Sequence, residues 1–344
     1  MSYSDVIQSN CEGKSPVPWW PKFAFHYTDV MNAVSILDSG ILYSRSNAKQ
    51  LGLMRNDNAS RQVIDMTQTE AISCVRFYFR PLTPTQYYNE GYKHTQLRYC
   101  NDENANTPVP VFFLFNLDKL LSIPEVKFSE QSQSGHGAQV LQGEQSFANL
   151  DFKRIYSNGF ESFEQNKKFR HAEILHPNAM SIDHCLNTIL CRNALERVTL
   201  LNMLKEKNQH AFIKYQGIVK ISKGEVFENN GLFITDCRYH DNTISIAFSD
   251  YYSKKQYAQR MMKQNCINSL KPVTVKLVLD WWNARSIVHH NVTETQIDYQ
   301  LTTGIMYKGV PTIPTAKTIR MQVFIEGRLM SYIEQSLAEV DLIK

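Results

Sequence analysis

The pattern of hydrophobic and polar residues predicts a strand followed by a helix within residues 23–45. Residues 23–28, FAFHYT, are mostly apolar and aromatic, as in a short β-strand. Apolar residues then return with helical spacing, and Gly40 can end that helix. Thr28 or Asp29 can cap its beginning, and residues 41–45 are expected to be extended. The apolar face of the helix consists of Val30, Ala33, Val34 and Leu37.

Three further apolar runs predict strands in the first 205 residues. They are SCVRFYF at 73–79, VPVFFLF at 109–115 and the run FRHAEILHP at 169–177. The first is followed by Pro81 and Pro84, which cannot donate to a sheet ladder and so end the strand. The second leads into a short helix, NLDKLL. Spacing of apolar residues predicts a longer helix over 186–205.

Polar stretches separate these elements. Residues 1–20 are polar and end in PVPWWP, which indicates an arm that packs its tryptophans on the protein body. Residues 46–70 are rich in asparagine and predict a loop with one helical turn. Residues 127–149 have almost no large apolar side chains, and a loop of this length inside a domain is often a binding loop.

The pattern of apolar and polar residues changes beyond residue 205. Short β-branched and aromatic runs alternate with polar turns, and one segment, 253–270, has helical character. The expected strands lie at 212–221, 231–239, 243–252, 273–282, 297–307 and 319–327. We therefore predict an α+β protein with two domains: residues 1–205, a split mixed β-sheet with small helices, and residues 206–344, a β-rich domain whose role the sequence does not show.

Composition places the chain among globular proteins. Of its 344 residues 43% are hydrophobic and 20% are charged, and the net charge is +4. No apolar run approaches the roughly 18–20 residues of a membrane helix, and the first residues lack a signal-peptide pattern. The seven cysteines are scattered, which is typical of free thiols in a reducing compartment. A cytoplasmic protein with no membrane partner is expected.

No metal site is expected from the histidine and cysteine spacing. Cys185 and Cys191 are six residues apart near His184, but the usual zinc-ligand spacings are absent. Buried thiols explain these cysteines better. His289 and His290 point to opposite faces if the segment is extended, so they make a poor metal pair.

Three residues stand in an informative order along the chain: His26, Tyr78 and Glu173. Each lies on a predicted strand. His26 precedes a helix N-terminus, where backbone N–H groups can face a phosphate or carboxamide. Tyr78 lies on the opposite strand face from Phe77 and Phe79, which are expected in the core. Taken one at a time, these residues could equally be a buried histidine, a core aromatic and an edge-strand glutamate.

Together, five segments resemble the DarT family of DNA ADP-ribosyltransferases, the toxin halves of toxin–antitoxin and anti-phage pairs. The resemblance covers roughly residues 20–200 and departs from the family pattern at 80–88, RPLTPTQYY, which leaves the modified base open between thymine and guanine. The segments are FHYTDVMNAVSILDSGILYSR at 25–45, FYFRPLTP at 77–84, FSEQSQSGHGAQ at 128–139, LDFKRIYSN at 150–158 and RHAEILHP at 170–177.

The resemblance implies an NAD-dependent transfer of ADP-ribose to a base in single-stranded DNA. Glu173 is then the catalytic carboxylate, and Arg61, in the polar loop, assists the acceptor base; Arg55 and Arg45 are its competitors for that role. NAD is the co-substrate, no metal is required, and an ADP-ribosyl hydrolase antitoxin, of macrodomain or similar type, is an implied partner. The residues expected to hold NAD are His26, Thr28, Asn32, Tyr78 and Arg45.

The chemistry gives Glu173 a physical role. Cleavage of the bond between nicotinamide and ribose passes through an oxocarbenium ion, and a nearby carboxylate stabilises its positive charge. A base inside a duplex cannot reach the buried ribose carbon, so single-stranded or extruded DNA is expected. Candidates for the cationic, base-stacking groove that such DNA needs are Lys153, Arg154, Tyr156, Lys167, Lys168 and Arg170.

Two alternatives stay open at this point. The same chemistry could act on tRNA or protein, because no segment of the sequence reads DNA bases directly. The chain could also be a non-catalytic module that binds NAD or nucleic acid. Loss of NAD consumption in a Glu173 variant would separate the enzyme from the binding module.

Overall fold

The computed structural model describes residues 1–57, 72–98, 106–133, 138–159, 163–224 and 226–337. Backbone contacts divide the chain into two compact units. Unit 1 comprises Met1–Tyr88, Val111–Cys191 and Tyr215–Glu228, and unit 2 comprises Asn89–Pro110, Arg192–Lys214 and Asn229–Lys344. The chain therefore passes between the units several times.

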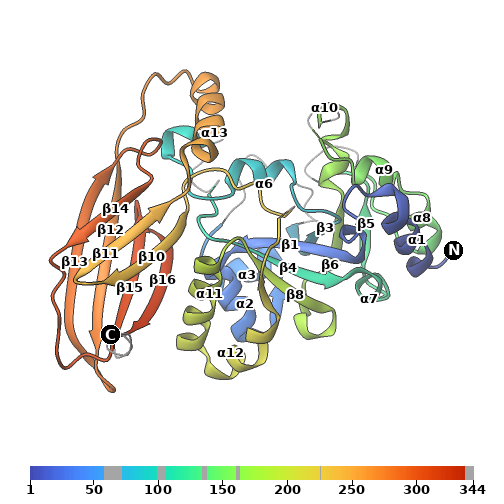
Figure 1. Cartoon of the computed structure of the whole chain (residues 1–344). Coiled ribbons are helices and arrows are strands. Elements are labelled where there is room, and N and C mark those ends of the chain that lie inside the picture. Colours follow the sequence, from blue (N-terminus) through green and yellow to red (C-terminus); the bar gives the residue numbers. More distant parts are fainter. Residues whose placement is uncertain (58–71, 99–105, 134–137, 160–162, 225, 338–344) are drawn as a thin grey trace. The chain divides into compact units, whose positions relative to one another are not determined.

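Unit 1 is built on a seven-stranded mixed sheet with the order β5-β6-β3-β1-β4-β8-β9 (Figure 1). The pairing of β8 with β9 is parallel, whereas β3 with β6 and β4 with β8 are antiparallel. This confirms the predicted fold class, a mixed-sheet core followed by a β-rich part. The strands are β1 Phe23–Asp29, β3 Cys74–Tyr78, β4 Pro110–Asn116, β5 Lys127–Ser129, β6 Glu173–Pro177, β8 Leu186–Cys191 and β9 Val219–Ile221, and a separate pair is formed by β2 Ile41–Tyr43 and β7 Ala179–Ser181.

Short helices surround this sheet, and the first long one follows the sequence pattern closely. Helix α2, Val30–Ser39, is capped by Asp29, whose side chain accepts from the backbone N–H of Met31. It ends at Gly40, whose φ of 68° favours glycine. The other helices of this part are α1 Tyr3–Ser9, α3 Arg45–Gln50, α6 Pro84–Asn89, α7 Leu117–Leu121, α8 Glu144–Ala148, α9 Phe152–Ile155 and α10 Phe163–Asn166, with short turns η1 Asn10–Lys14, η2 Trp20–Lys22, η5 Phe169–His171, η6 Ile182–His184 and η7 Gln216–Ile218.

The core of unit 1 is aromatic. All but the last residue of β4 are buried, as expected for a strand covered on both faces. The predicted packing of the N-terminal arm is confirmed, because Trp20 is fully buried and Trp19 contacts the rings of Phe23 and Phe25.

Several local predictions were wrong, and each error has a tertiary cause. Residues 186–191 form strand β8 and not a helix, because they pair with β4; the helix α11, Ala194–Lys207, starts only afterwards. The stretch 127–149 contains β5 and α8, since β5 adds to the edge of β6. Arg45 begins α3 and is not extended. Most of 212–221 belongs to α12, Gln209–Tyr215, and η7.

Unit 2 contains two antiparallel sheets. One has the order β10-β11-β14 and the other β13-β12-β15-β16. Along β12, Val273, Val275, Leu277, Leu279 and Trp281 are buried, and all but one of the residues between them are only partly buried. Helix α11 packs on β16 and β10. The elements are η3 Thr95–Leu97, α11 Ala194–Lys207, β10 Ile234–His240, β11 Thr243–Phe248, α13 Tyr251–Gln264, β12 Val273–Trp282, β13 Ile287–Ile297, β14 Gly304–Lys308, β15 Thr318–Ile325 and β16 Arg328–Ser336.

A buried charge cluster lies inside unit 2. Arg192 donates from Nε to Glu196 Oε1 over 3.1 Å and makes a further bond to the same oxygen from Nη2. Its Nη1 lies 3.5 Å from Glu90 Oε1. The guanidinium stacks on the ring of Phe233, 3.8 Å from the ring centre. One arginine thus faces two buried carboxylates, and burial raises the pKa of Glu196 to about 7 against the opposing effect of Arg192.

We expect this cluster to make the stability of unit 2 depend on pH. Because the folded-state pKa of Glu196, about 7, is higher than its ordinary value of 4.5, the folded state binds more protons between these pH values. Stability should therefore fall as the pH rises from about 4.5 to 7. Glu196→Gln should flatten this dependence in thermal unfolding at pH 5 and pH 7.5. An unchanged slope in the variant would contradict the assignment.

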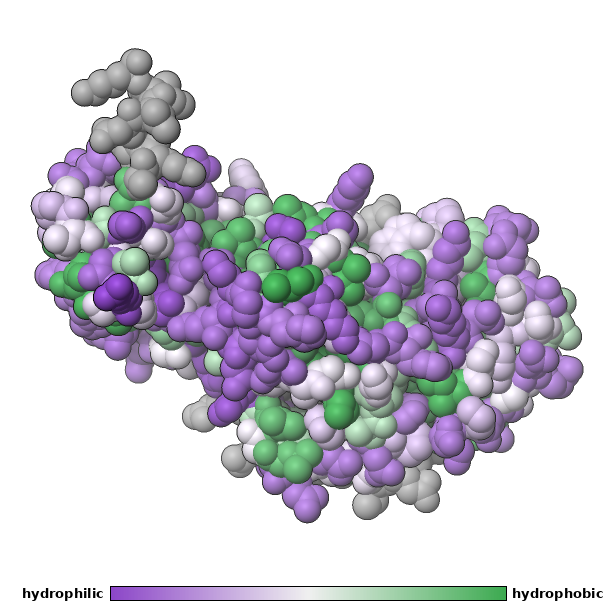
Figure 2. Space-filling model, turned by 90° about the horizontal axis from the view of Figure 1, so that it is seen from below, coloured by the Kyte–Doolittle hydropathy of each residue, from purple (hydrophilic) through white to green (hydrophobic). Residues whose placement is uncertain are grey.

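The surface offers no large apolar face in the view of Figure 2. Hydrophobic residues there form small separate groups within a mostly hydrophilic surface. Exposed large apolar side chains, such as Leu51, Ile213 and Met306, come from distant parts of the sequence, which is normal for globular proteins. In the part of the chain that the structure describes, no helix is long and apolar enough to cross a membrane.

Candidate active site

The site is organised by the pairing of β3 with β6. Tyr78 lies directly opposite Glu173 in the antiparallel register, so both side chains project from the same face of the sheet. The alternate residues of β3, Phe77 and the following Phe79, are fully buried, which confirms their predicted place in the core. Pairing of β6 with β5 adds Ser129 on the other side of Glu173.

Glu173 is fully buried and held by Arg76, a residue two positions before Tyr78. Arg76 Nε donates to Glu173 Oε2 over 2.8 Å, and Nη2 donates to Oε1 over 2.5 Å. This two-pronged geometry fixes the plane of the carboxylate as well as its position. Burial alone would lower the pKa of Arg76, but the charge and hydrogen bonds of Glu173 raise it above its usual value.

The loop after β5 supplies a third contact to the carboxylate. The hydroxyl of Ser132 donates to Glu173 Oε1 over 3.4 Å. The next residue, Gln133, is buried, and neither atom of its amide has a hydrogen-bond partner among the residues that the structure describes. The predicted binding loop therefore does reach the predicted catalytic glutamate.

Two neutral rings lie close to Arg76. Burial raises the pKa of Tyr78 to about 12, so its hydroxyl keeps its proton at neutral pH. Burial lowers the pKa of His171 to about 3, and the charges of Arg76, Lys167 and Arg80 act in the same direction. His171 is consequently uncharged at neutral pH.

His26 is linked to the site through the backbone of β3. Its Nδ1 lies 3.0 Å from the carbonyl oxygen of Arg76, and its ring contacts the rings of Phe77 and Phe113. Burial lowers its pKa, which favours the neutral ring. Thr28, two residues later, is buried in the same strand. The contacts of His26 and Thr28 with NAD stay predictions.

Asn32 and Arg45 hold the segment that leads toward Arg61. The Asn32 amide donates to the carbonyl of Asn56 over 2.7 Å and accepts from the backbone N–H groups of Arg55 and Asn56. Arg45 forms an ion pair with Asp57. Both side chains thus already bind protein groups, and their predicted contacts with NAD stay predictions. Arg61 lies outside the described residues.

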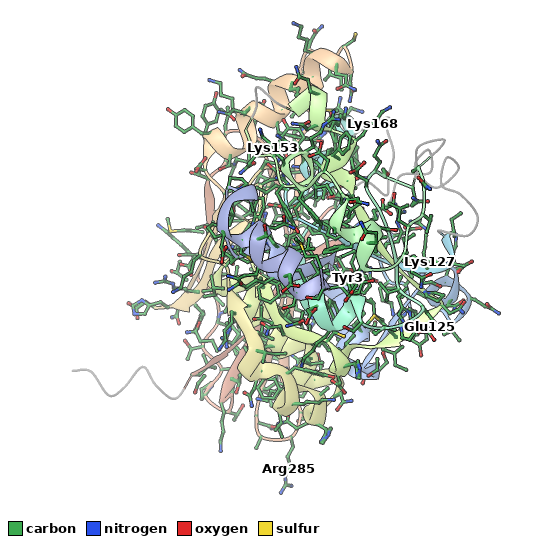
Figure 3. The ribbon with its side chains drawn as sticks, turned by 90° about the vertical axis from the view of Figure 1, so that its right-hand side faces the viewer. Tyr3, Glu125, Lys127, Lys153, Lys168 and Arg285 are labelled. Carbon is green, nitrogen blue, oxygen red and sulfur yellow. The ribbon has the colours of Figure 1, made fainter. Side chains whose placement is uncertain are left out.

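The predicted DNA-contacting residues divide into exposed and buried ones. Lys153 and Lys168 are exposed, and Figure 3 shows both extending from unit 1, where α9 packs against η5. Arg154 stacks on Phe169, and Arg170 binds the carbonyl of Gly159. Tyr156 is fully buried and stacks on Phe152, so it does not form an exposed platform for bases.

This arrangement defines a site built around a carboxylate. Among the described residues no group of three or more His, Cys, Asp or Glu side chains is placed to hold a metal ion. A fixed carboxylate, a tyrosine beside it and a polar loop above it fit stabilisation of a cationic sugar transition state. Stabilising such a transition state is the chemistry that ADP-ribosyltransferases perform.

The family follows from the sequence profile of DarT, described as "ssDNA thymidine ADP-ribosyltransferase, DarT", which matches residues 25–217. The chain belongs to this family. The prediction from the sequence motifs, in both family and enzyme class, is confirmed. No curated protein matches the chain.

The solved structures that match the chain include proteins from Thermus sp. 2.9 and Thermosipho africanus. Thermus sp. 2.9 DarT in complex with carba-NAD+ is 15% identical, with a TM-score of 0.46 over 60% of this chain and 98% of that one. The same protein in complex with ADP-ribosylated ssDNA is 16% identical, with a TM-score of 0.48 over 59% and 95%. Thermosipho africanus DarTG in complex with ADP-ribose is 12% identical, with a TM-score of 0.45 over 64% and 54%. The family assignment rests on the profile match.

Arg76 and Ser132 contact Glu173, although neither was predicted from the sequence as a site residue. Arg76 stands in the strand motif itself, CVRFYF, where its alternation with Tyr78 could have placed it on the face of Glu173. Only the register between β3 and β6 shows that the two side chains meet. Ser132 had no signal beyond its place in the polar loop.

Proposed function

We propose that this protein transfers ADP-ribose from NAD to a base of single-stranded DNA, with Glu173 as the catalytic carboxylate. The observation that carries the proposal is the convergence of Glu173, Tyr78 and the Ser132 loop on one face of the sheet, within a DarT-family chain. The buried carboxylate stabilises the oxocarbenium ion as the bond to nicotinamide breaks.

The other predicted residues take supporting roles. Tyr78 stacks on nicotinamide, and His26 and Thr28 bind the ribose or phosphate near the start of α2. Asn32 and Arg45 support the segment that carries Arg61, which assists removal of the proton from the acceptor base. The activity resides in the predicted domain 1–205.

The acceptor is thymine or guanine, and the family description favours thymine. Such an enzyme damages the DNA of its own host, which implies a toxin paired with an ADP-ribosyl hydrolase antitoxin. A toxin of this kind acts on DNA in the cytoplasm and fits a role in anti-phage defence.

The test is a set of single-stranded oligonucleotides, each containing one kind of acceptor base, incubated with NAD and read by mass spectrometry. The proposal expects a mass increase of one ADP-ribose on thymine-containing or guanine-containing strands. Modification of tRNA or protein without any oligonucleotide product would overturn the choice of acceptor while leaving the chemistry intact.

Tyr78 should act through its ring and not through its hydroxyl. Because burial raises the pKa of Tyr78 to about 12, its hydroxyl does not act as a base at neutral pH, and with the ring as the contact Tyr78→Phe should leave the transfer rate within a few-fold of wild type. Tyr78→Ala removes the stacking surface and should raise the KM for NAD about ten- to hundredfold, since stacking on an aromatic ring is worth about 1–3 kcal/mol. Equal losses in both variants would contradict the stacking role. Steady-state kinetics measures the effect.

Lys153 and Lys168 should contribute charge to DNA binding. Each phosphate contact on a single strand adds about 0.7 to the slope of log affinity against log salt, so Lys153→Ala combined with Lys168→Ala should reduce that slope by roughly 1.4. Fluorescence anisotropy of a labelled oligonucleotide at several salt concentrations measures it. Lys22→Ala, another exposed lysine of unit 1, serves as the control. An unchanged slope in the double variant would show that these lysines do not contact the DNA phosphates.

A further inference from the structure

Arg76 is more exposed than the carboxylate it holds. The side chain of Arg76 is 26% exposed, whereas that of Glu173 is 0% exposed. The guanidinium is therefore the outer member of the pair. Solvent therefore reaches the guanidinium but not the carboxylate.

One edge of this guanidinium makes no hydrogen bond to the residues that the structure describes. Its Nε and Nη2 donate to the two oxygens of Glu173. Within the part of the chain that the structure describes, Nη1 makes no hydrogen bond, so both of its N–H donors remain available. Arginine is always charged in proteins, and its planar donors match the oxygens of phosphate groups.

The surroundings of Arg76 favour an anion. Glu173, the carboxylate that pairs with the guanidinium, accepts two hydrogen bonds from Arg76 and one from Ser132. The neighbouring Tyr78 and His171 are uncharged at neutral pH. Lys167 and Arg80, which act on His171, add positive charge. Both substrates of the proposed reaction carry phosphate anions.

We infer that Arg76 is a substrate-contacting residue of the transfer reaction, whose free guanidinium edge binds a phosphate oxygen of the substrate while the other edge orients Glu173. The inference rests on the proposed function. The phosphate belongs either to the pyrophosphate of NAD or to the DNA backbone beside the acceptor base. Arg76 thereby couples binding of a phosphate to the position of the catalytic carboxylate.

The test compares Arg76→Gln, Arg76→Lys and wild type in steady-state transfer to a short oligonucleotide. If the phosphate is from DNA, Arg76→Gln should raise the oligonucleotide KM about tenfold. A neutral methylphosphonate linkage beside the acceptor base should then raise the oligonucleotide KM of the wild type but not that of the variant. If it is from NAD, the KM for NAD should rise about tenfold, and the methylphosphonate should affect both proteins equally. Arg76→Lys keeps the positive charge but loses the planar pair of donors. Its KM should lie between those of the wild type and Arg76→Gln.

Unchanged KM values for both substrates in Arg76→Gln would overturn the inference, even if kcat falls, because Arg76 would then only position Glu173. Should Arg76→Gln fail to fold, the same comparison is made by oligonucleotide and NAD binding to Glu173→Gln and to Arg76→Gln combined with Glu173→Gln, since the double change leaves no unpaired buried charge. Arg238→Gln, on an exposed arginine of unit 2, controls for the loss of one positive charge. Substrate binding by the Arg76 variants tests the inference, whereas the oligonucleotide assay and transfer by Glu173→Gln test the proposed function.

Discussion

Glu173→Gln is expected to reduce ADP-ribosyl transfer by at least about 10²–10³-fold, the range seen when one group that stabilises transition-state charge is removed. The substitution keeps the size of the side chain and removes its charge. The positive charge on the ribose then develops beside a neutral amide and the guanidinium of Arg76, which leaves the transition state without its counter-charge. Mass spectrometry of the modified oligonucleotide and consumption of NAD measure the effect.

The matched control is Glu125→Gln, which removes the charge of an exposed glutamate of the same unit (Figure 3). It should transfer at the wild-type rate. Thermal unfolding of both variants separates a catalytic loss from a folding loss, because Glu173 is buried in a sheet. A folded Glu173→Gln protein with normal transfer and normal host toxicity would remove the enzymatic role of this residue.

Of the substitutions proposed for this protein, Arg192→Met should lower the free energy of unfolding most. The change leaves Glu90 and Glu196, both fully buried, without the guanidinium that lies between them. Removing one partner from a buried ion pair typically costs about 3–5 kcal/mol, because an uncompensated charge stays inside the protein. For a unit of this size that corresponds to roughly 6–20 °C in unfolding temperature. Differential scanning calorimetry should show the shift in one unfolding transition.

Arg238→Met is the control for this experiment. Arg238 pairs with Asp236 on the surface, where its side chain is 74% exposed, and such pairs contribute little to stability. Its unfolding temperature should stay close to that of wild type. Similar shifts in unfolding temperature for both arginine variants would show that the buried Arg192 cluster contributes no more to stability than an exposed ion pair.

The same cluster connects stability with pH. With one guanidinium for two carboxylates, a proton retained by Glu196 relieves part of the repulsion between the acids. Arg192→Met and Glu196→Gln together should therefore be less destabilising than the sum of the single changes. This coupling is internal to unit 2 and is independent of the transfer chemistry.

Local sequence patterns predicted those elements whose signals lie within a few residues. Helix α2 has its cap, apolar face and terminal glycine inside one short segment, and the structure reproduces all three. The β-branched and aromatic residues of 273–282 likewise predicted a strand, which the structure shows as β12. Residues 186–191 and 127–129 were misjudged because their state depends on strand pairing with segments far away in the chain.

The sequence by itself determined the family and the order of the main site residues. His26, Tyr78 and Glu173 each lie in a short contiguous segment that resembles a DarT motif, so local patterns were enough to find them. The tertiary structure decided which of these side chains meet. Only the register of β3 against β6 sets Tyr78 opposite Glu173 and brings Arg76, 97 residues away in sequence, onto the carboxylate. Pairing across such distances is fixed by the packing of the whole sheet, so no local pattern could show that Glu173 is held by an arginine.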